Sequence, residues 1–115
     1  MASPTVTLGG REWHLRYDMN AIAELESALN RDIREIGLRI MRGKLGMREC
    51  RALVWAGILH EFEDAGIRQV GDWLNEAGFL KETDMKESLM AKVFDALSGA
   101  FPDKKPTEGS EDPKN

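Results

Sequence analysis

The feature that most constrains this chain is a series of short segments with helical hydrophobic spacing, each bounded by residues that start or stop helices. Within each segment, apolar residues recur at intervals of three and four, which places them on one face of a helix. We therefore expect a mainly α fold, in which four to five short helices form a compact bundle. The expected helices cover about 19–29, 33–41, 47–62 and 67–77, and a last one runs from a cap at Thr83 or Asp84 to Ser98.

Side chains that favour helix ends set these boundaries. Asp18 and Asp32 are N-cap candidates, and either Thr83 or Asp84 is expected to cap the last helix. Asn30 is expected to end the first helix in a left-handed conformation. Glycines are expected to end three others, at Gly43, Gly78 and Gly99.

Two helices carry the most informative stripes. The third is apolar over a wide arc, since Trp55 and Leu59 lie beside its main face, so we expect it to be central or to meet a partner. The last helix has the most regular hydrophobic stripe in the chain. Its members are Met85, Leu89, Met90, Val93, Phe94 and Leu97.

The N-terminal segment has a different period. Residues 5–8 alternate and are β-branched, Gly9-Gly10 follows, and then Trp13, Leu15 and Tyr17 alternate with polar residues. Two alternating runs around Gly-Gly predict a β-hairpin over about 5–17. The face that carries the aromatic residues must be covered by other elements, because an isolated hairpin is only marginally stable in water.

The length of 115 residues suits one domain, which we assign to residues 1–101. Residues 102–115 contain three prolines and no large apolar side chain, so we expect a disordered tail. No apolar run approaches the roughly 20 residues that cross a bilayer, and no secretory signal is visible. The single cysteine, Cys50, is expected to be a buried apolar residue and not a nucleophile, and it fits a reducing cytoplasm.

The sequence contains no recognisable catalytic motif. There is no phosphate-binding glycine loop and no Gly-x-Ser-x-Gly turn. His60 precedes Glu61, Glu63 and Asp64, but neighbouring helical residues do not converge on one ion, so a solvated acidic helix end is the preferred interpretation. We expect no metal, no cofactor and no enzymatic activity.

Residues 31–51 form the only cluster of one charge sign, with seven Lys or Arg against three acidic residues. This segment is expected to form two helices joined by a short turn. An alternative interpretation is therefore a small helix-turn-helix-like DNA-binding regulator. The ordinary interpretation is a solvated helical face or a surface for an acidic protein. The net charge of −4 argues against a general nucleic-acid binder, because phosphate neutralisation supplies most of that affinity.

Large apolar side chains exceed what such a small core needs, and this excess favours adaptable protein recognition. The residue order is also informative, because the chain carries LRYDMNAIAELE at 15–26, NRDI at 30–33 and ECRALVWAGI at 49–58. These segments resemble the tail assembly chaperones of long-tailed phages and prophages, and the related tail assembly proteins of gene transfer agents. The resemblance covers about 5–77, and Ile58 stands where the family pattern ends in Leu.

The resemblance implies a protein of the bacterial host cytoplasm that binds the tape measure protein, keeps it soluble and helps to recruit tail tube protein. Self-association is also expected of a coating protein, and another phage structural or adaptor role is a further alternative. A helix-in-groove contact would use large apolar side chains. Those predicted nearest the partner are Trp55, Leu59, Phe62, Trp73 and Phe79.

Overall fold

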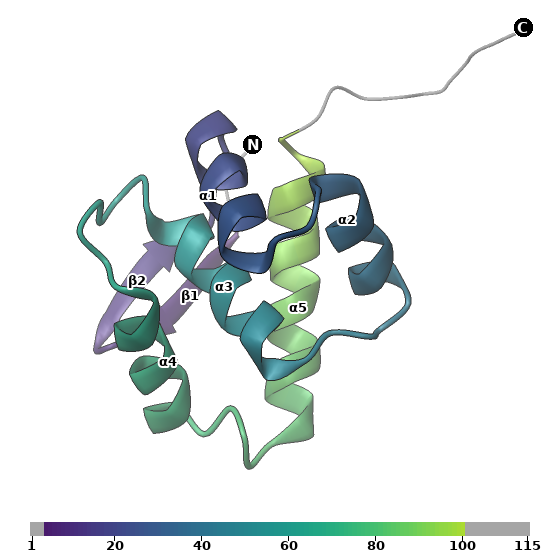
Figure 1. Ribbon diagram of the computed structural model, residues 1–115. Helices are drawn as coiled ribbons and strands as arrows, with labels where there is room; N and C mark the ends of the chain where they lie inside the picture. Colours follow the sequence, from purple (N-terminus) through teal and green to yellow (C-terminus); the bar gives the residue numbers. More distant parts are fainter. Residues whose placement is uncertain (1–3, 101–115) are drawn as a thin grey trace, which may run out of the picture.

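The computed structural model describes residues 4–100, and the predicted tail at 102–115 lies outside this range. The described residues form a two-stranded hairpin followed by five helices, which confirms the predicted fold class (Figure 1). The strands are β1 (Thr5–Leu8) and β2 (Arg11–His14). The helices are α1 (Met19–Leu29), α2 (Ile33–Met41), α3 (Met47–Ile58), α4 (Ile67–Glu76) and α5 (Thr83–Ser98).

The hairpin turns at Gly9 and Gly10, whose φ angles of 61° and 77° require residues without a Cβ penalty. The antiparallel register places Val6 opposite Trp13. The second strand is shorter than predicted, because it ends at His14. Beyond that residue the backbone turns toward α3, where the Arg16 N–H donates to the Gly57 carbonyl at 2.9 Å.

Helix α3 is the central element, as its wide apolar arc predicted. Eight of its 12 residues are buried, and it contacts α1, α4, α5 and β2. Figure 1 shows α3 in the middle of the molecule with the other elements around it.

The prediction that the third helix reaches residue 62 is wrong. Helix α3 ends at Ile58, and the N–H groups of Glu61 and Phe62 both donate to the Ile58 carbonyl at 3.0 Å. This tight turn brings His60 and Glu61 to the backbone of His14, so the tertiary contact with the hairpin ends the helix.

Most predicted helix ends are confirmed by side-chain geometry. The Asp18 carboxylate accepts from the Ala21 N–H at 2.9 Å, and Asp32 accepts from the Glu35 N–H at 2.8 Å. Asn30 adopts the left-handed conformation with φ 55°.

The start of α5 differs from the prediction. The N-cap is Glu82 and makes no side-chain cap bond, so Thr83 and Asp84 are the first residues of the helix and do not cap it. The N–H of Glu82 donates to the Gly78 carbonyl at 3.1 Å, and the N–H of Met85 donates to the Glu82 carbonyl at 3.2 Å. Consecutive backbone turns therefore lead into the helix.

Phe94 belongs to the regular stripe of the last helix, but 40% of it is exposed. Among the described elements, helix α5 packs against α2 and α3, and its buried face includes Leu89, Val93 and Leu97. Phe94 lies to the side of this face.

Candidate functional site

Helix α3 presents a single stripe to the surface. The four residues of α3 that are not buried are Met47, Arg48, Arg51 and Trp55, and Leu59 continues the series at the C-cap. Spacings of three and four place these side chains on one side of the helix. We call these five residues the α3 stripe.

The neighbouring helices flank the α3 stripe. On one side, the Arg48 guanidinium donates to the Ala28 carbonyl in α1 at 2.9 Å. On the other side, the Arg51 stem crosses α4 at Gly71, where an added Cβ would lie 2.9 Å from the Arg51 Cδ. The absent side chain at Gly71 is therefore what lets Arg51 lie flat between α3 and α4.

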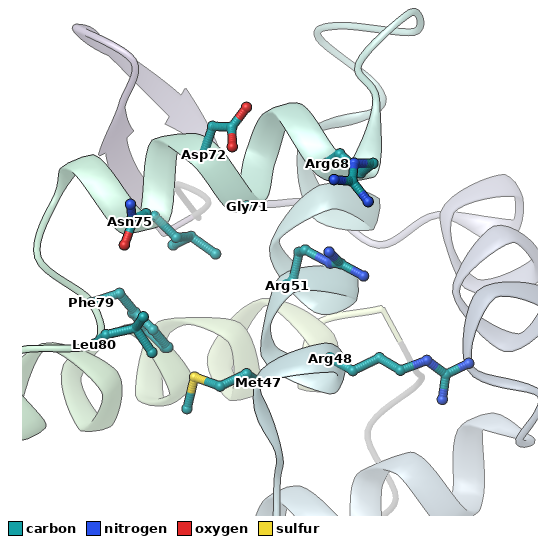
Figure 2. Close-up of a pocket in the computed structure, with 10 residues that line it drawn as sticks. Met47, Arg48, Arg51, Arg68, Gly71, Asp72, Asn75, Phe79 and Leu80 are labelled. Atoms are coloured by element: carbon teal, nitrogen blue, oxygen red, sulfur yellow. The ribbon is translucent and has the colours of Figure 1, made fainter.

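The first half of the α3 stripe opens into a hollow of about 410 Å³ between α3, α4 and the α4–α5 turn. Apolar side chains gather at one end of this hollow, with Arg51 and Arg68 at the other (Figure 2). Leu80 is 68% exposed and Met47 is 44% exposed, so both present apolar surface to solvent. We call it the arginine hollow. Its lining is Met47, Arg48, Arg51, Arg68, Gly71, Asp72, Leu74, Asn75, Phe79 and Leu80.

Arg51 has hydrogen-bonding capacity that the fold does not use. Its Nε is buried, and no hydrogen-bond partner for that atom lies within residues 4–100. A buried donor without a partner is costly, and native proteins satisfy nearly all such groups. The arginine hollow therefore combines exposed apolar side chains with a guanidinium whose buried Nε has no partner among the described residues.

The second half of the α3 stripe borders another hollow, of about 480 Å³, beside α1. Trp55 and Leu59 supply apolar surface, and the indole is held in place because its N–H donates to the Ala65 carbonyl at 2.8 Å. We call it the acidic hollow. Its lining is Asp18, Asn20, Ala21, Glu24, Trp55, Leu59, His60, Glu63 and Ala65.

Three aromatic rings hold the hairpin against the helices. Trp13 stacks on Phe62 and on Trp73, with ring centroids 5.8 Å and 5.6 Å apart. The Trp13 indole N–H donates to the Leu8 carbonyl at 2.9 Å. Phe62 and Trp73 thus have a packing role in this structure.

The structure does not gather the five predicted partner-binding residues on one surface. Trp55 and Leu59 line the acidic hollow, whereas Phe62 and Trp73 belong to the aromatic stack. Phe79 lines the arginine hollow but is only 5% exposed. Their role in binding stays a prediction.

Sequence reasoning did not select the exposed apolar residues of the arginine hollow, Met47 and Leu80. Leu80 lies between two helices and belongs to no hydrophobic stripe. An apolar residue outside the helical pattern is the one feature of the sequence that could have pointed to this surface. Arg51 was part of the basic segment 31–51, but spacing alone did not separate it from arginines that are paired internally.

His14, His60 and Glu61 join the hairpin to the end of α3. Both oxygens of Glu61 contact His14, at 3.0 Å from its backbone N and 2.8 Å from Nδ1, and His60 Nε2 lies 2.7 Å from the His14 carbonyl. The bond from the His14 backbone and then that from its ring lower the pKa of Glu61. Within residues 4–100, no three His, Cys, Asp or Glu side chains are arranged to hold a metal ion.

Part of the basic segment is neutralised inside the fold. Glu49 is buried, and its Oε2 forms a salt bridge with Arg39 Nε at 2.7 Å. Arg31 Nε lies 3.5 Å from the same oxygen. Burial alone would raise the pKa of Glu49, but bonds from Arg39 and the Gly46 N–H outweigh it and lower that pKa. Most of α3 is buried, so the α3 stripe is the part of this helix that faces solvent.

Cys50 is fully buried, and this burial raises the pKa of its thiol. The predicted buried position of this residue is confirmed.

Comparison with known proteins adds a family to this geometry. No helix among residues 4–100 is both long enough and apolar enough to cross a membrane. Neither the comparison with curated proteins nor that with solved structures found a match. A family model described as "Phage tail tube protein, GTA-gp10" matches residues 2–95, which is most of the chain. The chain therefore belongs to this family of phage and gene transfer agent tail proteins.

Proposed function

We propose that this protein is a phage tail assembly chaperone that binds the tape measure protein, keeps it soluble and assists tail tube assembly without catalysing a reaction. The observation that carries the proposal is the arginine hollow, in which Leu80 and Met47 expose apolar surface beside arginines. The family supports a role in tail assembly or structure. This work would take place in the host cytoplasm.

The hollow suits a helix that carries an apolar stripe. Tape measure proteins are long and helical, so their apolar stripes need cover before the tail is built. Fully burying one leucine or methionine contributes roughly 1.5–3 kcal/mol. A partner helix that docks in this groove and buries Leu80 and Met47 would thus gain a useful share of its binding free energy.

The test is co-expression of the tape measure protein with Leu80→Gln, which removes apolar surface from an exposed turn residue. We expect the soluble fraction of the tape measure protein to fall. The matched control is Met41→Gln, because Met41 is 70% exposed at the end of α2 and does not line the arginine hollow. Equal solubility with Leu80→Gln, Met41→Gln and the unchanged protein would refute the proposal.

The description of the family as a tail tube protein favours a second candidate, a structural role in the tail itself. The two functions differ in where the protein ends up. A chaperone leaves before the tail is complete, whereas a tube protein remains in many copies. Mass spectrometry of purified tails decides between them, and we expect the protein to be missing from finished particles.

A further inference from the structure

The two hollows lie one after the other along the α3 stripe. Arg51 lines the first and Trp55 the second, and these residues are one helical turn apart. From Arg48 to Leu59 the helix rises about 16 Å, at roughly 1.5 Å per residue. One partner helix of about three turns could therefore contact both hollows.

The ends of the α3 stripe carry opposite charge. The arginine hollow has three arginines against Asp72, whereas the acidic hollow has three carboxylates, from Asp18, Glu24 and Glu63. Apolar side chains are present in both, with Leu80 and Met47 at one end and Trp55 and Leu59 at the other. A ligand that follows the stripe meets apolar side chains in both hollows and a change of charge sign between them.

We propose that the α3 stripe docks a single amphipathic helix that is acidic at one end and basic at the other, with the acidic end over the arginine hollow. Identifying this helix with part of the tape measure protein rests on the function proposed above. Carboxylates match the positive charges of Arg51 and Arg68, and lysines match the acidic hollow. The reversed direction would put like charges together, so the charges select one direction of binding.

The probe for this proposal is a synthetic 18-residue helical peptide with leucines at spacings of three and four, three glutamates near one end and three lysines near the other. A nitroxide is attached to either end, and backbone amide signals of the protein are recorded by NMR. We expect the label at the acidic end to broaden signals near Leu80, and the label at the basic end to broaden signals near Glu63. Broadening of both regions by both labels would overturn the proposal, and so would no binding of the peptide.

Charge reversal gives an independent test. Arg68 is exposed on α4, and Arg68→Glu is expected to weaken peptide binding about tenfold, because an attraction becomes a repulsion in a partly enclosed hollow. The matched control is Arg34→Glu, the same change on the exposed surface of α2 outside both hollows. A peptide with lysines in place of its glutamates should restore binding to Arg68→Glu.

The outcomes separate this proposal from the general function. If Arg68→Glu binds the peptide as tightly as the control while Leu80→Gln still lowers tape measure solubility, the directed docking is wrong and the chaperone function stands. If Leu80→Gln has no effect on solubility, the chaperone function fails whatever the peptide does. Self-association that Arg68→Glu abolishes, without peptide binding, would assign the stripe to a second copy and overturn the proposal.

Discussion

Two residues of α3 show how single positions decide the packing of this molecule. Gly57 faces the segment after the hairpin, and an added Cβ would lie 2.8 Å from Leu15 Cδ2 and 2.9 Å from the Tyr17 hydroxyl. That hydroxyl donates to the Leu53 carbonyl at 2.6 Å, and burial raises the pKa of Tyr17, so it stays protonated. Glu49 is the only described charged side chain among the buried residues, and its arginine partners offset the cost of its burial.

Replacing Gly57 by alanine should destabilise the protein by about 1–3 kcal/mol, because overpacking a filled core exceeds the gain of up to about 1 kcal/mol in helix propensity. The control is Gly37→Ala in α2, where an added Cβ meets nothing within 4 Å and should stabilise by about 0.5–1 kcal/mol. Urea unfolding measures both. Stabilisation by Gly57→Ala would contradict the close contact.

Replacing Glu49 by glutamine should destabilise the protein by about 2 kcal/mol at neutral pH, since bonds to a charged acceptor are lost. The folded pKa of Glu49 lies below its ordinary value of 4.5, so its stabilisation is complete above that pH. It is lost as the pH falls through the lower folded pKa. The difference in unfolding free energy between the two proteins should therefore shrink below pH 4.5, and a difference that stays constant to pH 2 would refute this role.

At the scale of elements, the hairpin is stable because it is docked. A two-stranded hairpin is only marginally stable by itself. Here the aromatic stack joins β2 to α4, and Glu61 and His60 hold the backbone of His14. The hairpin in turn ends α3 at Ile58, so the length of the central helix depends on a contact made 46 residues away in sequence.

Truncation of Trp13 to alanine should cost about 3–5 kcal/mol, because the residue is buried and stacks on two rings. Hydrogen exchange should show the greatest loss of protection in the hairpin and the residues after α3. Phe94→Ala serves as the control, since Phe94 is half-exposed and makes none of these stacks. Similar losses of unfolding free energy for both variants would contradict the anchoring role of Trp13.

At the scale of the whole molecule, the described residues combine a buried central helix with one open stripe. Apolar residues lie at both ends of the stripe with Arg48 and Arg51 between them, and the hollows beside its two halves carry opposite charge. Such a surface should hold a helix mainly by apolar burial, which salt does not weaken, with a smaller contribution from charge pairs that salt screens.

We therefore expect the affinity for a tape measure fragment to fall by no more than about tenfold between 50 and 200 mM salt. A protein that contacts six to ten phosphates loses about 10³–10⁵ over the same range. Isothermal titration at several salt concentrations measures this slope. A loss of a thousandfold, together with binding to duplex DNA, would favour the nucleic-acid alternative.

Local chemistry in the sequence was sufficient to predict most elements. The caps at Asp18 and Asp32 and the left-handed stop at Asn30 involve atoms only a few positions apart, so they can be read from neighbouring residues. The Gly9-Gly10 turn is equally local. The helical periods likewise predicted which faces would be apolar.

Only the tertiary structure decided which apolar faces are covered and which charges remain free. Phe94 continues a regular stripe yet stays half-exposed, whereas Phe79 lies in the core, because each depends on the elements packed around it. The same holds for Arg39 and Arg51, which both belong to the basic segment: the first is paired with Glu49, and the second lines an open hollow. Sequence period fixes a side chain's direction from its own helix, but burial and pairing depend on neighbours distant in the chain.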